Sequence, residues 1–189
     1  MLVFLLAAVA TAIPAPPPPP PIELWHGAIS GMSPAQVQAL FPKGRQPQLA
    51  VGYPPVPNMV EGGGGAGYAV DEDIFGHSAV ATYYFQAGRL LEVIVDVKNM
   101  GLRRTRDNVD VARQIEGGLT NYYGPPKVCA DTDKRGLARL DCRWTVRSLQ
   151  VGMSYVDYGG LSPSLTIAAR SLAPKRKVGP AIFPRRGVR

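Results

Sequence analysis

The two cysteines of this chain are the residues whose type and spacing most clearly predict a bond. Cys129 and Cys142 enclose the segment CADTDKRGLARLDC, in which DTDKRG is typical of a turn and the following ARLDCRW alternates like a strand. We expect the two thiols to pair in an oxidising compartment and to tie two neighbouring strands together. Closing a loop of this size stabilises a fold by about 3 kcal/mol.

Metal and catalytic sites are not predicted. The two histidines, His26 and His77, do not lie at ligand spacing from a second ligand, so we expect no metal ion and no cofactor. The run GGGGAG at 62–67 matches the glycine pattern of dinucleotide sites, but it follows no strand and precedes the acidic run DED at 71–73. His77 and Ser78 would point to opposite faces of a strand and could not act as base and nucleophile. We therefore expect a protein that is not an enzyme.

A long irregular connection at 53–76 is the candidate binding loop. A connection of that length without secondary structure is either a binding loop or disordered, and its glycines favour mobility. The side chains that could form a contact surface are Tyr53, Met59, Tyr68 and Phe75.

Positive charge is concentrated at the end of the chain. Six of the 21 basic residues lie in the tail, which leaves 15 basic against 14 acidic residues elsewhere. Such a tail either docks on an anionic surface, where each cation contributes about 1 kcal/mol, or is a solubilising disordered end. Nucleic acid is not an expected partner, because Phe183 is the only aromatic residue among these basic residues and could not stack several bases. The candidate basic surface comprises Arg139, Arg143, Lys175, Arg176, Lys177, Arg185, Arg186 and Arg189.

The first residues indicate export. The run from Leu2 to Ala12 is apolar and uncharged, and it ends on Ala-Thr-Ala, a small-x-small sequence that signal peptidase favours. It is too short for a membrane span, which needs about 20 apolar residues. We predict a signal peptide at 1–12, a proline-rich linker at 13–22, a single domain at 23–173 and a disordered basic tail at 174–189. The expected location is the periplasm or the exterior of the cell.

Two hairpins are predicted inside the domain. In the first, Ala87 and Gly88 form the turn, which places Tyr84 opposite Leu91 and Thr82 opposite Val93 on an apolar face, with Glu92 and Asp96 on a wetter one. In the second, Arg147 and Ser148 form the turn, which places Trp144 opposite Val151 and Cys142 opposite Met153. A later strand buries Leu165, Ile167 and Ala169, and completes an antiparallel sheet.

Two helices are predicted before these strand groups. One begins near Thr105, carries Val111, Ile115, Leu119 and Tyr122 on one side, and ends at Gly124. The other begins with GMSPAQV: Ser33 is placed to cap the helix, Pro34 to occupy its first position, and Gln36 to complete a capping box.

The run Gly31-Met32-Ser33-x-x-Gln36-Val37, followed by Leu40, resembles a helix start of small exported bacterial envelope proteins, including the SmpA/OmlA lipoproteins and the β-lactamase-inhibitor-like fold. The resemblance implies an envelope location and an α+β fold, an antiparallel sheet with helices packed on one face, possibly as two helix-plus-strands units in tandem. It carries over no functional residue.

These observations predict an exported, non-catalytic cell-envelope protein that binds another protein or an anionic surface. The alternative is a secreted inhibitor or modulator of an enzyme, in which the loop at 53–76 enters a partner's cleft.

Overall fold

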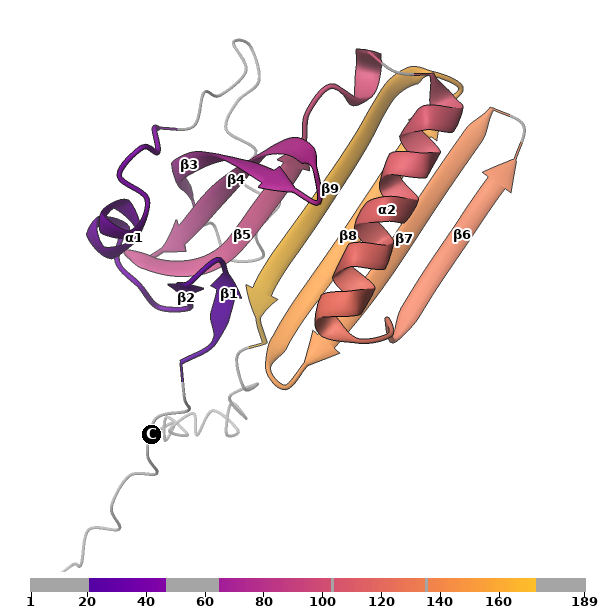
Figure 1. Cartoon of the computed structure of the whole chain (residues 1–189). Coiled ribbons are helices and arrows are strands. Elements are labelled where there is room, and N and C mark those ends of the chain that lie inside the picture. Colours follow the sequence, from indigo (N-terminus) through magenta and orange to yellow (C-terminus); the bar gives the residue numbers. More distant parts are fainter. Residues whose placement is uncertain (1–20, 47–64, 103, 135, 173–189) are drawn as a thin grey trace, which may run out of the picture.

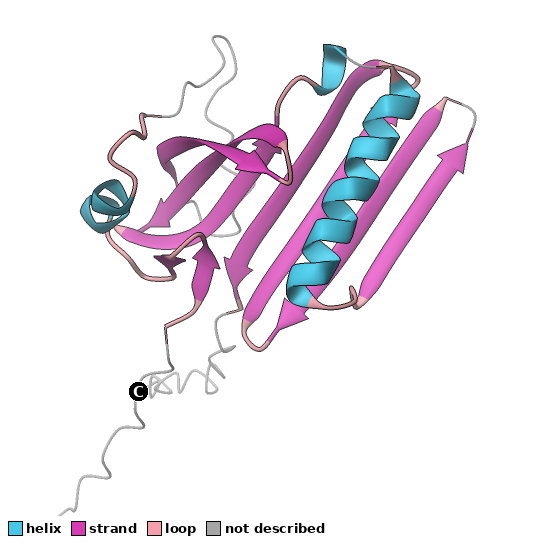
Figure 2. Ribbon diagram, viewed as in Figure 1, coloured by secondary structure: helices cyan, strands magenta, loops and turns pink. Residues whose placement is uncertain are grey.

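The computed structural model of this chain describes residues 21–46, 65–102, 104–134 and 136–172 (Figures 1 and 2). The predicted signal peptide, nearly all of the proline-rich linker and nearly all of the basic tail lie outside these residues. The elements in chain order are β1 Glu23–Trp25, β2 Ala28–Ile29, α1 Pro34–Leu40, β3 Gly65–Ile74, β4 His77–Gln86, β5 Arg89–Val97, η1 Met100–Leu102, α2 Thr105–Tyr123, β6 Val128–Lys134, β7 Leu137–Val146, β8 Leu149–Tyr158 and β9 Leu161–Ser171.

Seven of the strands form one continuous antiparallel sheet in the order β3-β4-β5-β9-β8-β7-β6. The last strand of the chain, β9, therefore lies in the middle, between β5 and β8. Figure 1 shows α2 lying along the strands β7 and β8, while the small hairpin β1–β2 lies beside β5 and β9. The sheet thus has one face that carries both α2 and the small hairpin.

The predicted α+β fold, with helices packed on one face and possibly two tandem units, is wrong. Strands hold 55% of the described residues and helices only 22%, so the protein is mainly antiparallel β. The first helix, α1, has seven residues and contacts the edge strand β3, so it does not form a helical layer over the sheet. No boundary separates two units either, because β9 joins both strand groups through hydrogen bonds.

The predicted register is confirmed for one hairpin and wrong for the other. In β7–β8, Trp144 pairs with Val151 and Cys142 with Met153, as a two-residue turn at 147–148 requires. In β4–β5, the register shifts between Tyr84 and Phe85, so that Tyr84 pairs with Glu92 and not with Leu91. A β-bulge places two residues of one strand opposite one residue of the other, and all later pairs move by one position.

The extra residue is Leu91 of β5, and the prediction, which lacked the bulge, therefore assigned the wrong residues of β4 to the inner face. The side chains buried on the inner face are Tyr83 and Ala81, whereas the prediction placed Thr82 and Tyr84 there. Of the two acids expected on the wetter face, Asp96 is exposed and its carboxylate accepts a hydrogen bond from Thr166 at 2.9 Å, but Glu92 is buried. Burial raises the pKa of Glu92, and the nearby Arg170 opposes that shift.

Both predicted helices form. Ser33 Oγ accepts from Gln36 N, the Gln36 side chain accepts from Ser33 N at 2.8 Å, and Pro34 occupies the first turn of α1. The predicted cap of the second helix is wrong, because Thr105 is the first residue of α2 and the N-cap is Arg104. The Arg104 side chain makes no capping hydrogen bond.

The core lies between the inner face of the sheet, α2 and the small hairpin. From α2 it receives Val111, Ile115 and Leu119, and from the hairpin it receives Leu24. Tyr122, predicted as part of the same apolar side of the helix, is 76% exposed.

Candidate functional site

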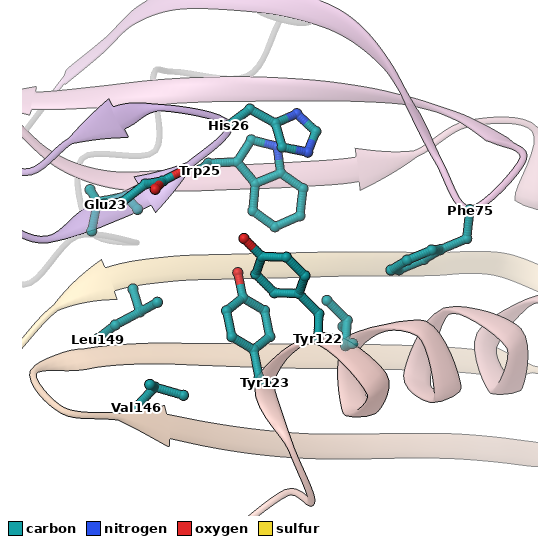
Figure 3. Close-up of a pocket in the computed structure, with 10 residues that line it drawn as sticks. Glu23, Trp25, His26, Phe75, Tyr122, Tyr123, Val146 and Leu149 are labelled. Atoms are coloured by element: carbon teal, nitrogen blue, oxygen red, sulfur yellow. The ribbon is translucent and has the colours of Figure 1, made fainter.

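A pocket of about 490 Å³ lies on the inner face of the sheet, between the hairpin β1–β2 and the C-terminal end of α2 (Figure 3). Its lining comes from four segments that are far apart in the sequence: β1 with its turn, the β3–β4 turn, the end of α2 and the β7–β8 turn region. The lining residues are Glu23, Leu24, Trp25, His26, Phe75, Leu119, Tyr122, Tyr123, Val146 and Leu149.

One wall of the pocket is fixed by a buried carboxylate. The Glu72 side chain is only 7% exposed, and its Oε2 accepts a hydrogen bond from Trp25 Nε1 at 2.8 Å. The same oxygen lies 2.9 Å from His26 Nδ1, and Tyr83 Oη donates to Oε1 at 3.5 Å. A buried carboxylate is stable only with such partners. Glu72 therefore holds Trp25 and His26 in fixed positions at the pocket.

The protonation of His26, at the rim of the pocket, depends on its contact with Glu72. The hydrogen bond with Glu72 raises the pKa of His26 above its ordinary value, and partial burial opposes the shift. His26 and Gly27 both have positive φ, 43° and 84°, and together they form the turn between β1 and β2. Glu23 Oε1 accepts a hydrogen bond from Gly27 N at 2.7 Å across this turn.

The opposite wall is the last turn of α2. Tyr122 and Tyr123 lie edge to face, with ring centroids 4.8 Å apart and planes at 84°. Burial raises the pKa of Tyr123 to about 12. The helix ends directly afterwards at Gly124, whose φ of 83° suits glycine. In Figure 3 both phenol hydroxyls point toward Trp25 and His26 across the pocket.

Phe75 extends the aromatic lining from the β3–β4 turn. Phe75 and Gly76 both have positive φ, 50° and 84°, a turn geometry in which asparagine or glycine is the usual first residue. A phenylalanine there is strained. Ala87 and Arg147 have a similar positive φ in the β4–β5 and β7–β8 turns, so the contacts of the Phe75 ring, and not its backbone, relate it to the site. The Phe75 ring lies against Gly118 of α2, where an added Cβ would be 2.5 Å from the ring. His77 Nε2 also lies 3.0 Å from Gln114 Oε1, so the turn contacts the helix through two residues.

The chemistry of the pocket is that of a binding site with an aromatic lining. Four aromatic side chains and four aliphatic ones surround it, and the polar groups are Glu23, His26 and the two phenols. A histidine oriented by a carboxylate is a common arrangement for proton transfer. The described lining, however, contains no serine, threonine or cysteine that such a histidine could activate. The arrangement can hold an apolar or aromatic group and contact a polar group at the rim.

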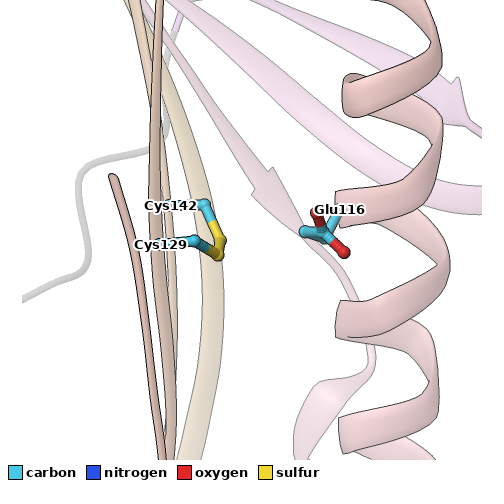
Figure 4. A group of neighbouring side chains, drawn as sticks. All are labelled: Glu116, Cys129 and Cys142. Carbon is cyan, nitrogen blue, oxygen red and sulfur yellow. A yellow bond between two sulfur atoms is a disulfide. The ribbon is translucent and has the colours of Figure 1, made fainter. Parts of the chain in front are cut away.

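The predicted disulfide is confirmed (Figure 4). Cys129 and Cys142 are bonded and lie directly opposite each other in β6 and β7. The bond attaches the edge strand β6 to the sheet and is consistent with an oxidising compartment. Glu116 of α2 lies near the two sulfurs, and the three potential ligand atoms are within 4.8 Å of one another. Because the sulfurs are bonded to each other, they are not thiolate ligands for a metal in this structure.

The residues predicted for a binding loop do not form one surface. Tyr53 and Met59 lie outside the described residues, and the irregular connection ends earlier than predicted, because β3 starts at Gly65. Tyr68 is buried, and its hydroxyl donates to the carbonyl oxygen of Phe41 at 2.6 Å. Phe75 alone of the four lines the pocket.

The predicted basic surface is described at two positions. Arg139 and Arg143 lie on β7, on the sheet face opposite α2, where a shallow groove of about 410 Å³ follows the strands. Arg139 forms an ion pair with Asp141, and Asp141 also accepts a hydrogen bond from Ser154 at 2.6 Å. The six basic residues of the tail lie outside the described residues.

Sequence reasoning missed the residues that build the pocket. Trp25, Glu72, Tyr122 and Tyr123 were not identified as site residues, and His26 was expected only to pack near the start of the domain. Two local features could have pointed to them: the Tyr-Tyr pair at a helix end that precedes Gly124, and Phe75 directly before the glycine of a hairpin turn.

No protein-family model, curated protein or solved structure shows significant similarity to this chain. Within the described residues, no helix combines the length and the apolar character that a membrane span requires.

Proposed function

We propose that this chain is an exported, non-catalytic binding protein of the cell envelope, and that its ligand places an apolar group in the pocket between β1 and α2. The observation that carries the proposal is the set of aromatic side chains from three separate elements around one pocket of about 490 Å³. Small-molecule sites have this size and this mainly apolar lining, with a few polar groups that fix orientation.

Two further observations support the pocket as a site. Glu72 fixes Trp25 and His26 through hydrogen bonds, so this wall is formed before any ligand arrives. A preorganised site loses less side-chain entropy on binding. Phe75 lies in the β3–β4 turn, and its side chain reaches both the pocket and Gly118 of α2.

The experiment uses tert-butylbenzene as a neutral apolar probe, titrated into the protein while ¹H–¹⁵N spectra are recorded. We expect saturable shifts at Trp25, Leu119 and Leu149. The variant Val146→Trp should remove them, because Val146 lies at the pocket and is 39% exposed, leaving space for a larger ring. The matched control Val128→Trp changes an exposed valine on β6 outside this pocket and should leave the titration unchanged. Shifts that persist in Val146→Trp, or that spread over the surface, would contradict the proposal.

Export is tested separately by fractionating bacterial cells that express the full chain. Processed protein in the periplasm or medium, with Cys129 and Cys142 unreactive toward a thiol reagent before reduction, is the expected result. Unprocessed protein confined to the cytoplasm would contradict this part of the proposal.

The alternative of a secreted enzyme inhibitor has no support from the described part of its loop. Tyr68 is buried, and the Phe75 ring already lies against Gly118, so these two side chains have intramolecular contacts.

A further inference from the structure

We infer that the group held in the pocket is an organic cation, an alkylated ammonium group attached to an apolar body. The inference rests on the function proposed above and specifies the chemistry of its ligand. Two independent features of the lining carry it: the aromatic rings and the balance of charge.

The aromatic rings supply the first argument. The face of an aromatic ring carries partial negative charge and attracts a cation that lies within about 6 Å of the ring centre. Trp25, Phe75, Tyr122 and Tyr123 all line this pocket. Trp25, the strongest ring type for this interaction, is held in place by its hydrogen bond to Glu72. The rings of Tyr122 and Tyr123 are perpendicular to each other, with centroids 4.8 Å apart, and both line the pocket.

The charge balance supplies the second argument. Apart from the two phenols, the titratable side chains that line the pocket are those of Glu23 and His26. His26 Nδ1 lies 2.9 Å from a carboxylate oxygen of Glu72, and this hydrogen bond, together with the charges of both Glu72 and Glu23, raises the pKa of His26. Glu23 is exposed and accepts a hydrogen bond from Gly27 N, but it has no ion-pair partner among the described residues. The two carboxylates of Glu23 and Glu72 outnumber the single imidazole, so this side of the pocket is net negative in either protonation state of His26. Such a charge favours a cation and disfavours an anion.

The type of cation follows from the scarcity of acceptors. A primary ammonium has three N–H donors that need partners once water is removed. The lining side chains offer Glu23, the phenol oxygens and the imidazole, whereas the remaining side chains are hydrocarbon or indole. An alkylated ammonium group has fewer N–H donors, or none, and its methyl groups pack against rings, so it loses less on entering this pocket.

The test compares two isosteric probes on the full-length protein: phenyltrimethylammonium, which is cationic, and tert-butylbenzene, which is neutral. We expect the cation to bind about threefold to thirtyfold more tightly, the range that a cation over aromatic faces supports. Dissociation constants come from ¹H–¹⁵N titrations followed at Trp25. Equal or weaker binding of the cation overturns the inference but leaves the proposed function intact. Saturable binding of neither probe overturns both.

Variants separate the two arguments. Glu23→Gln keeps an acceptor for Gly27 N but removes the charge, and Tyr122→Leu removes a ring from a side chain that is 76% exposed. Each should reduce the preference for the cation by several-fold. Tyr158→Leu is the matched control, because Tyr158 is also exposed, at 58%, and does not line the pocket. An unchanged preference in both Glu23→Gln and Tyr122→Leu, with folded spectra, would refute the assignment of the cation to this pocket.

Discussion

Adjacent glycines in α2 allow the contact between the β3–β4 turn and the helix to be measured. A Cβ added at Gly117 would meet no atom within 4 Å, whereas a Cβ added at Gly118 would lie 2.5 Å from two ring carbons of Phe75. Gly117→Ala therefore changes the helix alone. Gly118→Ala changes the helix and also displaces the Phe75 ring.

The expected difference follows from helix propensity and burial. Replacing glycine by alanine inside a helix stabilises it by about 1 kcal/mol. The Phe75 side chain is 50% exposed, so displacing it forfeits the burial of about half a ring. Since full burial of phenylalanine is worth about 1.5–3 kcal/mol, the loss is about 1 kcal/mol. We expect Gly117→Ala to raise the free energy of unfolding by about 1 kcal/mol and Gly118→Ala to leave it nearly unchanged.

Urea denaturation of the disulfide-bonded protein measures both values, and the same two substitutions in a Phe75→Ala background complete a double-mutant cycle. Without the ring, Gly118→Ala should stabilise the protein as much as Gly117→Ala does. The coupling between positions 75 and 118 should thus be about 1 kcal/mol. If Gly118→Ala is already as stabilising as Gly117→Ala while Phe75 is present, the turn does not pack on the helix, and the closure of the pocket at this side is wrong.

Three further perturbations have defined outcomes. The double substitution Cys129→Ser and Cys142→Ser should lower the free energy of unfolding, measured in urea, by about 3 kcal/mol. Amide hydrogen exchange should accelerate first in β6, and uniform acceleration would show that β6 does not open separately. The pKa of His26 is raised above 6.5 in the folded protein, so its ion pair with Glu72 contributes fully to stability below pH 6.5, by at most about 1 kcal/mol. This contribution should be lost as the pH rises through the raised pKa. Urea denaturation at several pH values should therefore show the difference in unfolding free energy between the wild type and His26→Asn shrinking with pH, and parallel curves would exclude the effect. Phe75→Asn should leave the melting temperature nearly unchanged, because the gain from asparagine at the positive φ offsets the lost contact of the ring with Gly118. It should weaken tert-butylbenzene binding, and unchanged binding would remove Phe75 from the site.

Local patterns predicted much of the fold because the interactions behind them are local. The capping box at Ser33 and Gln36 and the second hairpin are each determined by residues close in sequence, and both match the structure. The first hairpin has an equally clear turn, but no glycine marks the bulge at Leu91, and the predicted register was therefore displaced by one residue. The α+β prediction failed because the local signals that mark a helix do not reveal how many strands join into one sheet.

The pocket could not be predicted in the same way. Its walls meet only because β5 pairs with β9, which places the two strand groups in one sheet and brings β1 opposite the end of α2. Trp25 and Tyr123 have no pattern in common, and the carboxylate that positions Trp25 comes from Glu72, 47 residues further along the chain. Only the chain topology relates these residues.

The central position of β9 has a consequence for the order in which this protein can be made. Until the last strand emerges, β3–β5 and β6–β8 are separate three-stranded groups, and β5 and β8 each lack their final neighbour. Asp96 and its partner Thr166 are 70 residues apart, so this pairing must wait for nearly the whole domain to be synthesised. Long-range strand pairing of this kind is slow, since the chain loses entropy before it gains contacts. A product truncated before β9 would therefore expose the unpaired edges of β5 and β8 to aggregation.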